Sequence, residues 1–195
     1  MATLGVILVD QIVKLAVYFT MYRGEEIPIF GDWFKLHYTT NPGMAFGLEL
    51  GWEYGKFGLT FFRLIAVCVI TYLIVQWYKR RVHPGVLWCM AIILGGAVGN
   101  VIDSTFYGVY LNNAPHGSTT PWFHGQVIDM FYFDIWQGMV PEWVPLFGGE
   151  FYALWPIFNI ADASIFVGIT LMLIFQKRFF ERSDDLKQKA EYNWR

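Results

Sequence analysis

The sequence predicts an all-α membrane protein with four transmembrane helices and both chain ends in the cytoplasm. A small β-hairpin or cradle and an aromatic-rich loop are expected on the outer side of the membrane. Three observations support this fold class. Of the 195 residues, 55% are hydrophobic and only 15% are charged, whereas about a quarter of the residues in soluble domains are charged. Several apolar runs are about 20 residues long, enough to cross the hydrocarbon layer, and Lys and Arg gather in segments that alternate with them.

The apolar runs define four predicted spans in a single membrane domain of residues 1–195. The first span contains Asp10 and Lys14 and lacks both a basic start and a small-residue cleavage pattern, so we interpret it as a retained helix and not as a cleaved signal. No repeat or low-complexity segment divides the chain. The spans cover about residues 2–22, 57–78, 86–103 and 155–176, with outer loops at 23–56 and 104–154 and a cytoplasmic tail at 177–195.

The distribution of Lys and Arg sets the predicted orientation. The loop 104–154 has neither residue, and the loop 23–56 has only Arg23, Lys35 and Lys56. Basic residues concentrate in cytoplasmic segments of membrane proteins. The basic residues expected inside are Lys79, Arg80, Arg81, Lys177, Arg178, Arg182, Lys187, Lys189 and Arg195.

The two outer loops differ in pattern. In residues 33–40, WFKLHYTT, apolar and polar side chains alternate before Asn41-Pro42-Gly43, which predicts two short strands around a turn. Residues 121–155 are rich in Trp, Tyr and Phe and are interrupted by Pro and Gly. Such aromatic residues favour the membrane–water interface, so we expect this loop to lie along the outer membrane surface.

Several polar residues fall inside the predicted spans, where an ionisable group costs about 2.5–3.5 kcal/mol on insertion scales. Asp10 and Lys14 have i, i+4 spacing. Mutual neutralisation of their charges explains their presence in the span at least as well as a direct role in catalysis does. Asn100 with Asp103 and Asn159 with Asp162 repeat an i, i+3 spacing that places both side chains on one helix face. One such pair could be interhelical hydrogen bonding alone; two pairs in different helices favour a shared polar site.

Gly95 and Gly99 form a small-xxx-small pattern, which predicts close helix approach.

The depths of the ionisable groups indicate one site near the outer leaflet. At about 1.5 Å per residue, Asp162 and Arg63 lie roughly 10 and 9 Å below the outer ends of their spans. Asp103 ends the third span on the same side, and Asp129 precedes the fourth. If Lys14 neutralises Asp10, Arg63 remains as the cation for the other carboxylates. Two neighbouring carboxylates share one proton and can act on a water as base and acid together, as in aspartic proteases.

The sequence lacks the motifs of metal-dependent, serine-dependent and phosphate-binding sites. The sequence contains no H-E-x-x-H, cysteine cluster, G-x-S-x-G or glycine-rich phosphate loop, so we expect no cofactor or metal. The four histidines are scattered and are interpreted as surface residues. Cys68 and Cys89 fall within predicted spans and are interpreted as packing residues. A formal charge of −2 without a basic stripe argues against nucleic acid as a partner.

Five motifs together resemble one family, the bacterial lipoprotein signal peptidases, also called type II or prolipoprotein signal peptidases. The motifs are DQIVK (10–14), NPGMAFG (41–47), GGAVGNVID (95–103), VIDM (127–130) and FNIADAS (158–164).

The resemblance implies a multi-pass aspartic endopeptidase of the bacterial inner membrane, with its active site near the periplasmic leaflet. Such an enzyme removes the signal peptide from diacylglyceryl-modified prolipoproteins by cleaving before the lipidated cysteine. Its partners are these substrates and membrane lipid, and we expect a monomer. The catalytic pair falls on Asp129 and Asp162. The residues that bind substrate or support the site fall on Asp10, Lys14, Asn41, Gly43, Asn100, Asp103, Asn159 and Ala161.

The sequence departs from the family pattern at two places. Ser104 stands where many members have Arg, and residues 110–125 resemble an insertion. We hypothesise that Arg63 supplies the missing cation to the substrate or to Asp103.

Two rival functions remain open. An ion-coupled transporter would place polar residues across the full membrane depth, and a membrane scaffold would leave the buried carboxylates without a role.

Overall fold

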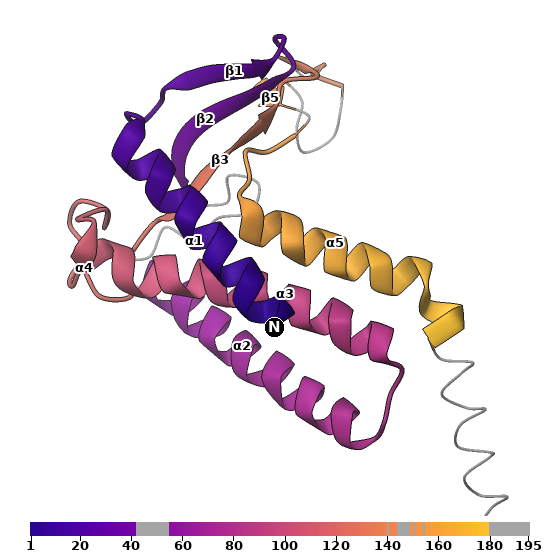
Figure 1. The fold of residues 1–195 in the computed structure, drawn as a ribbon. Coiled ribbons are helices and arrows are strands. Elements are labelled where there is room, and N and C mark those ends of the chain that lie inside the picture. Colours follow the sequence, from indigo (N-terminus) through magenta and orange to yellow (C-terminus); the bar gives the residue numbers. More distant parts are fainter. Residues whose placement is uncertain (42–54, 140, 144–148, 150, 154, 180–195) are drawn as a thin grey trace, which may run out of the picture.

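A computed structural model describes residues 1–41, 55–139, 141–143, 149, 151–153 and 155–179. Most of this part is helical, and a small antiparallel sheet covers one end of the helices (Figure 1). The predicted combination of apolar helices and a small sheet is therefore confirmed. The long helices are α1 (Ala2–Thr20), α2 (Gly55–Lys79), α3 (Pro84–Ile102) and α5 (Ile160–Ile174).

Within the described ranges, three helical segments are long and apolar enough to cross a membrane: Ala2–Thr20, Gly55–Lys79 and Pro84–Tyr110. The third is longer than predicted because a π-helical turn, η1 (Asp103–Tyr107), and the short α4 (Gly108–Tyr110) continue α3. Large apolar side chains point outward from α1, α2 and α5, a surface that suits hydrocarbon better than water. They include Leu4, Leu8, Ile12, Phe61, Phe62, Ile65, Val69, Phe166, Val167 and Leu173.

The fourth predicted span is wrong at its start, since α5 has 15 residues and begins at Ile160, not at Trp155. Asn159 has an extended backbone and accepts a hydrogen bond from the Asp162 N–H, which makes it the N-cap of α5. Asp162 therefore lies in the first turn of its helix and not about 10 Å below its start.

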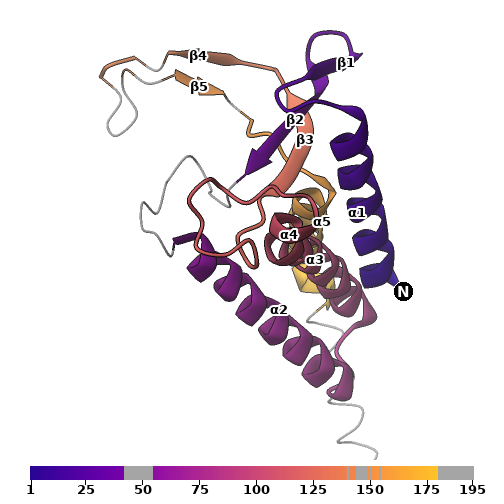
Figure 2. The same cartoon turned by 90° about the vertical axis from the view of Figure 1, so that its left-hand side faces the viewer.

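Helix α3 lies at the centre and packs against α1, α2 and α5 (Figures 1 and 2). Its glycines allow this close packing, as predicted. A Cβ at Gly95 would lie 2.7 Å from Val6 Cβ, and one at Gly99 would lie 2.5 Å from Asp10 Oδ2. Gly99 thus makes room for a site carboxylate as well as for a helix.

The main sheet has the antiparallel order β1 (Glu26–Phe30), β2 (Phe34–Asn41) and β3 (Val127–Phe133). The strand predicted in residues 33–40 is confirmed as β2, which forms a hairpin with the preceding strand β1 through a turn in which Gly31 has a φ of 52°. The turn predicted at residues 41–43 and the strand expected after it are not tested. Asn41 is the last residue of β2, and the residues directly after it lie outside the described part. The prediction that all of 121–155 is a surface loop is also wrong, because β3 is a largely buried strand.

A second, two-stranded sheet pairs β4 (Gln137–Met139) with β5 (Phe151–Ala153).

Strand β3 also pairs with the residue that leads into α5. Phe131 and Phe158 exchange backbone hydrogen bonds of 2.8 and 3.0 Å. Aromatic rings on the same strand stack across the sheet, including Phe34 on Phe131 at 6.2 Å between centroids. These contacts fix the start of α5 beside β3, and so hold two distant parts of the sequence together.

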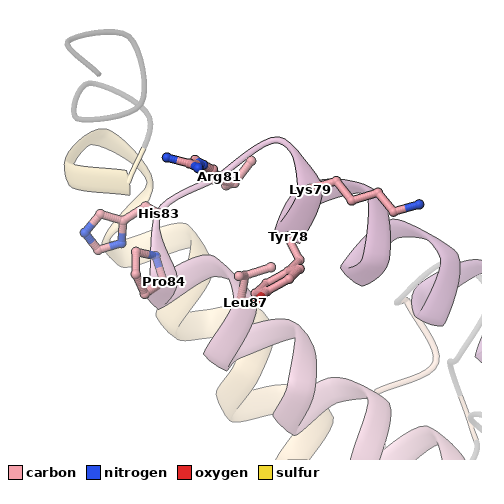
Figure 3. Close-up of a pocket in the computed structure, with 7 residues that line it drawn as sticks. Tyr78, Lys79, Arg81, His83, Pro84 and Leu87 are labelled. Atoms are coloured by element: carbon pink, nitrogen blue, oxygen red, sulfur yellow. The ribbon is translucent and has the colours of Figure 1, made fainter. Parts of the chain in front are cut away.

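The opposite end of the bundle carries the basic residues Lys79, Arg80 and Arg81 in the α2–α3 turn (Figure 1). A pocket of about 780 Å³ is lined there by residues of the turn, with Tyr78 beside Leu87 and with the nitrogen ends of Lys79 and Arg81 pointing to opposite sides (Figure 3). This pocket is remote from the buried carboxylates.

Two smaller expectations turn out differently. Cys89 is buried as predicted, but Cys68 is exposed on the apolar face of α2. His124 was expected at the surface and is instead buried in the loop before β3.

Candidate active site

Asp129 lies in the middle of β3 and is 2% exposed. Its Oδ1 accepts a 2.6 Å hydrogen bond from Asn159 Nδ2. Asn41, at the end of the neighbouring strand β2, also hydrogen-bonds to this carboxylate. The pairing of Thr39 with Asp129 and of Asn41 with Val127 explains this contact, because it places Asn41 two positions along from Asp129 on the facing strand.

Two amides connect Asp129 to Asp162. Asn159 Nδ2, which donates to Asp129, also donates a 3.3 Å hydrogen bond to Asn100 Oδ1. Asn100 Nδ2 in turn donates to Asp162 Oδ1 at 2.8 Å. The structure therefore brings the two predicted carboxylates to either end of one chain of hydrogen bonds, which draws on β3, α3 and α5. Both predicted Asn-x-x-Asp pairs contribute their asparagine to this chain.

The charge on Asp129 depends on this environment. Burial and the neighbouring Asp162 carboxylate raise the pKa of Asp129 to about 7, although the hydrogen bonds from Asn159 and Asn41 act in the opposite direction. Desolvation and like charge both disfavour the ionised form of a carboxylate. Asp129 can therefore hold a proton close to neutral pH.

Lys14 forms the centre of an adjoining ion cluster. Its Nζ lies 2.8 Å from Asp10 Oδ2 and 2.6 Å from Asp103 Oδ2, and all three side chains are completely buried. The same Nζ donates to Asn100 Oδ1 at 3.0 Å. Asn100 thus joins the ion cluster to the carboxylates of the hydrogen-bonded chain.

Asp10 has a second role at the start of α5. Its Oδ1 accepts a 2.9 Å hydrogen bond from the Ala161 N–H, one of the helix N-terminal groups that have no partner within the helix. Ala161 is itself completely buried, and the backbone of Gly96 packs against its carbonyl. The predicted site residue Ala161 therefore contributes its backbone and its small size.

Gln11 and Tyr107 belong to this network and were missed in the sequence. Gln11 Nε2 donates to Asp103 Oδ1 at 2.9 Å, and its Oε1 accepts from Tyr107 Oη at 2.9 Å. The signal for Gln11 was its place beside Asp10 within an apolar run. Tyr107 had no such signal, because tyrosine is common near the ends of membrane helices.

Within the described residues Arg63 forms no ion pair with Asp103, whose Oδ2 lies 2.6 Å from Lys14 Nζ. The alternative, that Arg63 supplies a cation to the substrate, stays a prediction. Arg63 Nη1 donates to Ser104 Oγ at 2.7 Å. The carboxylates of Asp162, Asp103 and Asp129 nevertheless lie within electrostatic range of the guanidinium. Arg63 therefore reaches the position of Ser104 from α2, next to the site.

Gly43, the remaining predicted site residue, lies outside the described residues. No group of three or more His, Cys, Asp and Glu side chains in the described ranges has metal-site geometry, and the absence of a cofactor stays a prediction.

The sequence is similar to known proteins along most of its length. The family model for signal peptidase (SPase) II matches residues 2–178. A lipoprotein signal peptidase of Amoebophilus asiaticus is 47% identical over 171 residues, covering 86% of this chain and 72% of the relative. A lipoprotein signal peptidase of Chlorobium phaeobacteroides is 36% identical and covers 91% of this chain and 94% of the relative.

The fold also matches solved structures. One bacterial membrane enzyme aligns with a TM-score of 0.61 at 22% identity, over 91% of this chain and 85% of that chain. A second aligns with a TM-score of 0.59, also at 22% identity, over 89% of this chain.

Proposed function

Since the chain belongs to the signal peptidase II family of lipoprotein-processing membrane proteases, we propose that it acts on diacylglyceryl-modified prolipoproteins. It cleaves the peptide bond before the lipid-bearing cysteine and releases the signal peptide. The observation that carries this proposal is the hydrogen-bonded chain from Asp129 through Asn159 and Asn100 to Asp162.

In the proposed mechanism Asp129 and Asp162 share one proton and act on a water. Asp129 holds the proton, because burial raises its pKa to about 7, and donates it to the scissile carbonyl oxygen. Asp162, which is less buried than Asp129, removes a proton from the water as its oxygen attacks the carbonyl carbon. Asp162 then gives this proton to the leaving nitrogen as the C–N bond breaks, and Asp129 takes a proton back from a hydroxyl of the tetrahedral intermediate, which leaves a carboxylic acid product and restores the pair.

The surrounding polar residues position this pair. Asn100 and Asn159 fix one oxygen of each carboxylate, and Asn41 supports Asp129 from the sheet. The ion pairs of Lys14 with Asp10 and Asp103 connect α1 to the end of α3, and Lys14 also donates a hydrogen bond to Asn100. We place Gly43 and the backbone of Ala161 with the residues that support the site or contact substrate, on the family resemblance.

The proposed topology is a single membrane domain with four spans, of which α5 is the shortest. The basic α2–α3 turn faces the cytoplasm together with both chain ends. The sheet lies at the other end of the helices (Figure 1), and we place it, with Asp129 of β3 and Asp162 in the first turn of α5, near the periplasmic leaflet of the inner membrane. A substrate can then keep its acyl chains in lipid while its peptide enters the site.

The gathering of the buried carboxylates at one end also distinguishes this proposal from an ion-coupled transporter. A relay across the membrane needs ionisable groups at several depths.

The test is cleavage by the purified chain in detergent. A diacylglyceryl-modified prolipoprotein is expected to release its signal peptide, and the same substrate without the lipid is expected to be cleaved much more slowly. Mass spectrometry of the product locates the cut before the modified cysteine. Equal cleavage of both substrates, or a cut elsewhere, contradicts the proposed function.

A further inference from the structure

The pocket at the α2–α3 turn has no role in the mechanism described so far. Its volume of about 780 Å³ falls within the roughly 300–1,000 Å³ of pockets that hold small molecules. Lys79 and Arg81 line it with their nitrogen ends on opposite sides, and Tyr78, Pro84 and Leu87 give it an apolar lining (Figure 3). The pocket therefore combines apolar surface with two cations.

Hydrogen bonds fix the backbone around this pocket. The N–H groups of Arg81 and Val82 both donate 3.1 Å bonds to carbonyls in the last turn of α2, which is the pattern of a Schellman C-cap. On the other side of the turn, His83 Nδ1 accepts a 3.0 Å bond from the Gly85 N–H and caps α3. The pocket is thus formed by the fold itself, before any ligand binds.

Arg81 occupies a backbone position that glycine usually fills. Its φ is 53°, in the left-handed region that is unfavourable for residues with a Cβ. At this position of a Schellman cap most helices have glycine. Because the sequence places an arginine here in spite of the conformational cost, we infer that the guanidinium itself contributes to the turn's role.

The positive charge at this end of the bundle has no counter-charge in the described part of the chain. Arg80 in the turn and Arg178, which lines a second pocket beside it, add to the two cations of the first pocket. No Asp or Glu occurs in residues 55–102 or 163–179, and the ion pairs of the described ranges involve none of these cations. Such a cluster attracts an anionic partner.

The pocket lies where the apolar surface of the helices ends. Helix α2 is apolar enough to cross a membrane, and Lys79 is its last residue. The neighbouring rings of Tyr78 and Trp88 are 72% and 60% exposed, and exposed aromatic residues favour the level of the lipid headgroups. Lys79 and Arg81 are therefore at the depth where phospholipids carry their phosphates.

We propose that this pocket binds the headgroup of an anionic membrane phospholipid, whose phosphate pairs with Lys79 and Arg81. Basic pockets at the cytoplasmic ends of membrane helices suit such headgroups, whereas a zwitterionic headgroup brings its own cation close to the cluster. In the proposed topology this lipid belongs to the cytoplasmic leaflet. The inference goes beyond the proposed function, since none of the lining residues takes part in catalysis.

The test is lipid binding to the purified full-length chain in detergent, measured by native mass spectrometry. The probes are phosphatidylglycerol and phosphatidylcholine with the same acyl chains, and the wild type is expected to bind the first more tightly. In the double variant Lys79→Gln, Arg81→Gln the affinity for phosphatidylglycerol is expected to fall roughly 30-fold, about fivefold for each cation. Equal binding of the two lipids by the wild type overturns the proposal.

A matched control separates a site from general attraction to positive charge. The double variant Arg80→Gln, Lys177→Gln removes two cations from the same end of the bundle, and neither residue lines the pocket. Its affinity for phosphatidylglycerol is expected to stay near that of the wild type. A loss equal to that of the pocket variant would mean that lipid is attracted without a site, and overturns the proposal.

Arg81→Gly separates binding from folding. Glycine removes the cation and relieves the left-handed backbone, so Tm is expected to stay the same or rise while the affinity for phosphatidylglycerol falls about fivefold. Unchanged affinity in this variant contradicts the role of the guanidinium. Millimolar inorganic phosphate is expected not to displace the lipid; displacement would assign the pocket to a free anion and overturn the lipid proposal. Each readout is independent of cleavage, so failure of the proposed function would leave these results unchanged.

Discussion

Asn159 donates a 2.6 Å hydrogen bond to Asp129 while its own Oδ1 accepts from the Asp162 backbone N–H. One side chain therefore caps α5 and positions a carboxylate on β3. The backbone pairing of Phe131 with Phe158 holds the two elements at the distance that this requires. The start of α5 and the centre of β3 consequently form one structural unit, and changes to Asn159 test both of its roles.

Asn159→Ala is expected to destabilise the chain by about 1 kcal/mol through loss of the N-cap and to lower kcat through loss of the bond to Asp129. Asn159→Ser keeps a capping hydroxyl but cannot reach Asp129 as the amide does, so stability returns while kcat stays low. Thermal unfolding and kcat of the two variants measure these effects. Recovery of both quantities in the serine variant would contradict a separate role at Asp129.

The raised pKa of Asp129 predicts a pH dependence of stability. This pKa is about 7 in the folded chain, compared with about 3.9 for an unfolded aspartate. Because the folded state binds the proton more tightly, this group stabilises the fold below about pH 4, and the contribution is lost as the pH rises to about 7. The loss is on the order of a few kcal/mol.

Tm measured at several pH values checks this prediction. The wild type is expected to lose Tm between about pH 4 and pH 7 relative to Asp129→Asn, in which the titrating carboxyl is absent. Parallel curves for the two proteins would show that Asp129 titrates alike in the folded and unfolded states.

Lys14→Met is expected to destabilise the chain by about 3–5 kcal/mol, because Asp10 and Asp103 would both remain buried without their cation. Lys35→Met is the matched control, since Lys35 pairs with Asp134 and Glu26 at the more accessible sheet surface, where we expect a smaller loss. Denaturant unfolding of the two variants in detergent compares them. Equal losses would mean that the buried cluster contributes no more than a surface ion pair.

Gly99→Ala tests the close approach of α1 to α3. A new Cβ would lie 2.5 Å from Asp10 Oδ2, so we expect a loss of about 1–3 kcal/mol from overpacking. Gly5→Ala in α1 meets nothing within 4 Å and is expected to leave Tm unchanged or raise it slightly, since alanine favours helix. A neutral Gly99→Ala would show that the Asp10 carboxylate can move without cost.

Much of the helical part and of the site followed from single residues in the sequence. Asp10, Lys14, Asn100, Asp103, Asn159 and Asp162 are polar in otherwise apolar runs, and lipid makes such residues expensive. Their spacing gave the face of each helix. It could not give partners across helices, so Lys14 was assigned to Asp10 alone, and its contact with Asp103 appeared only in the structure.

The sheet was harder to predict. Residues 127–133, VIDMFYF, are almost continuously apolar because β3 is buried by both the sheet and the start of α5. Such a run lacks the alternation that marks a half-buried strand, and its aromatic residues resemble those of a membrane interface. The early start predicted for the fourth span has a related cause, because the apolar residues Trp155 and Phe158, which precede α5, pack against the Phe133 ring of the sheet.

The most direct test of the central claim is cleavage of a lipidated prolipoprotein by Asp129→Asn and Asp162→Asn, each purified and shown by its Tm to be folded. Asparagine keeps the shape of each side chain but cannot exchange the proton that the pair must share. Each single variant is expected to lose signal-peptide release, and the double variant to be no worse than either. Substantial release by a folded single variant would contradict a catalytic pair formed by these two carboxylates.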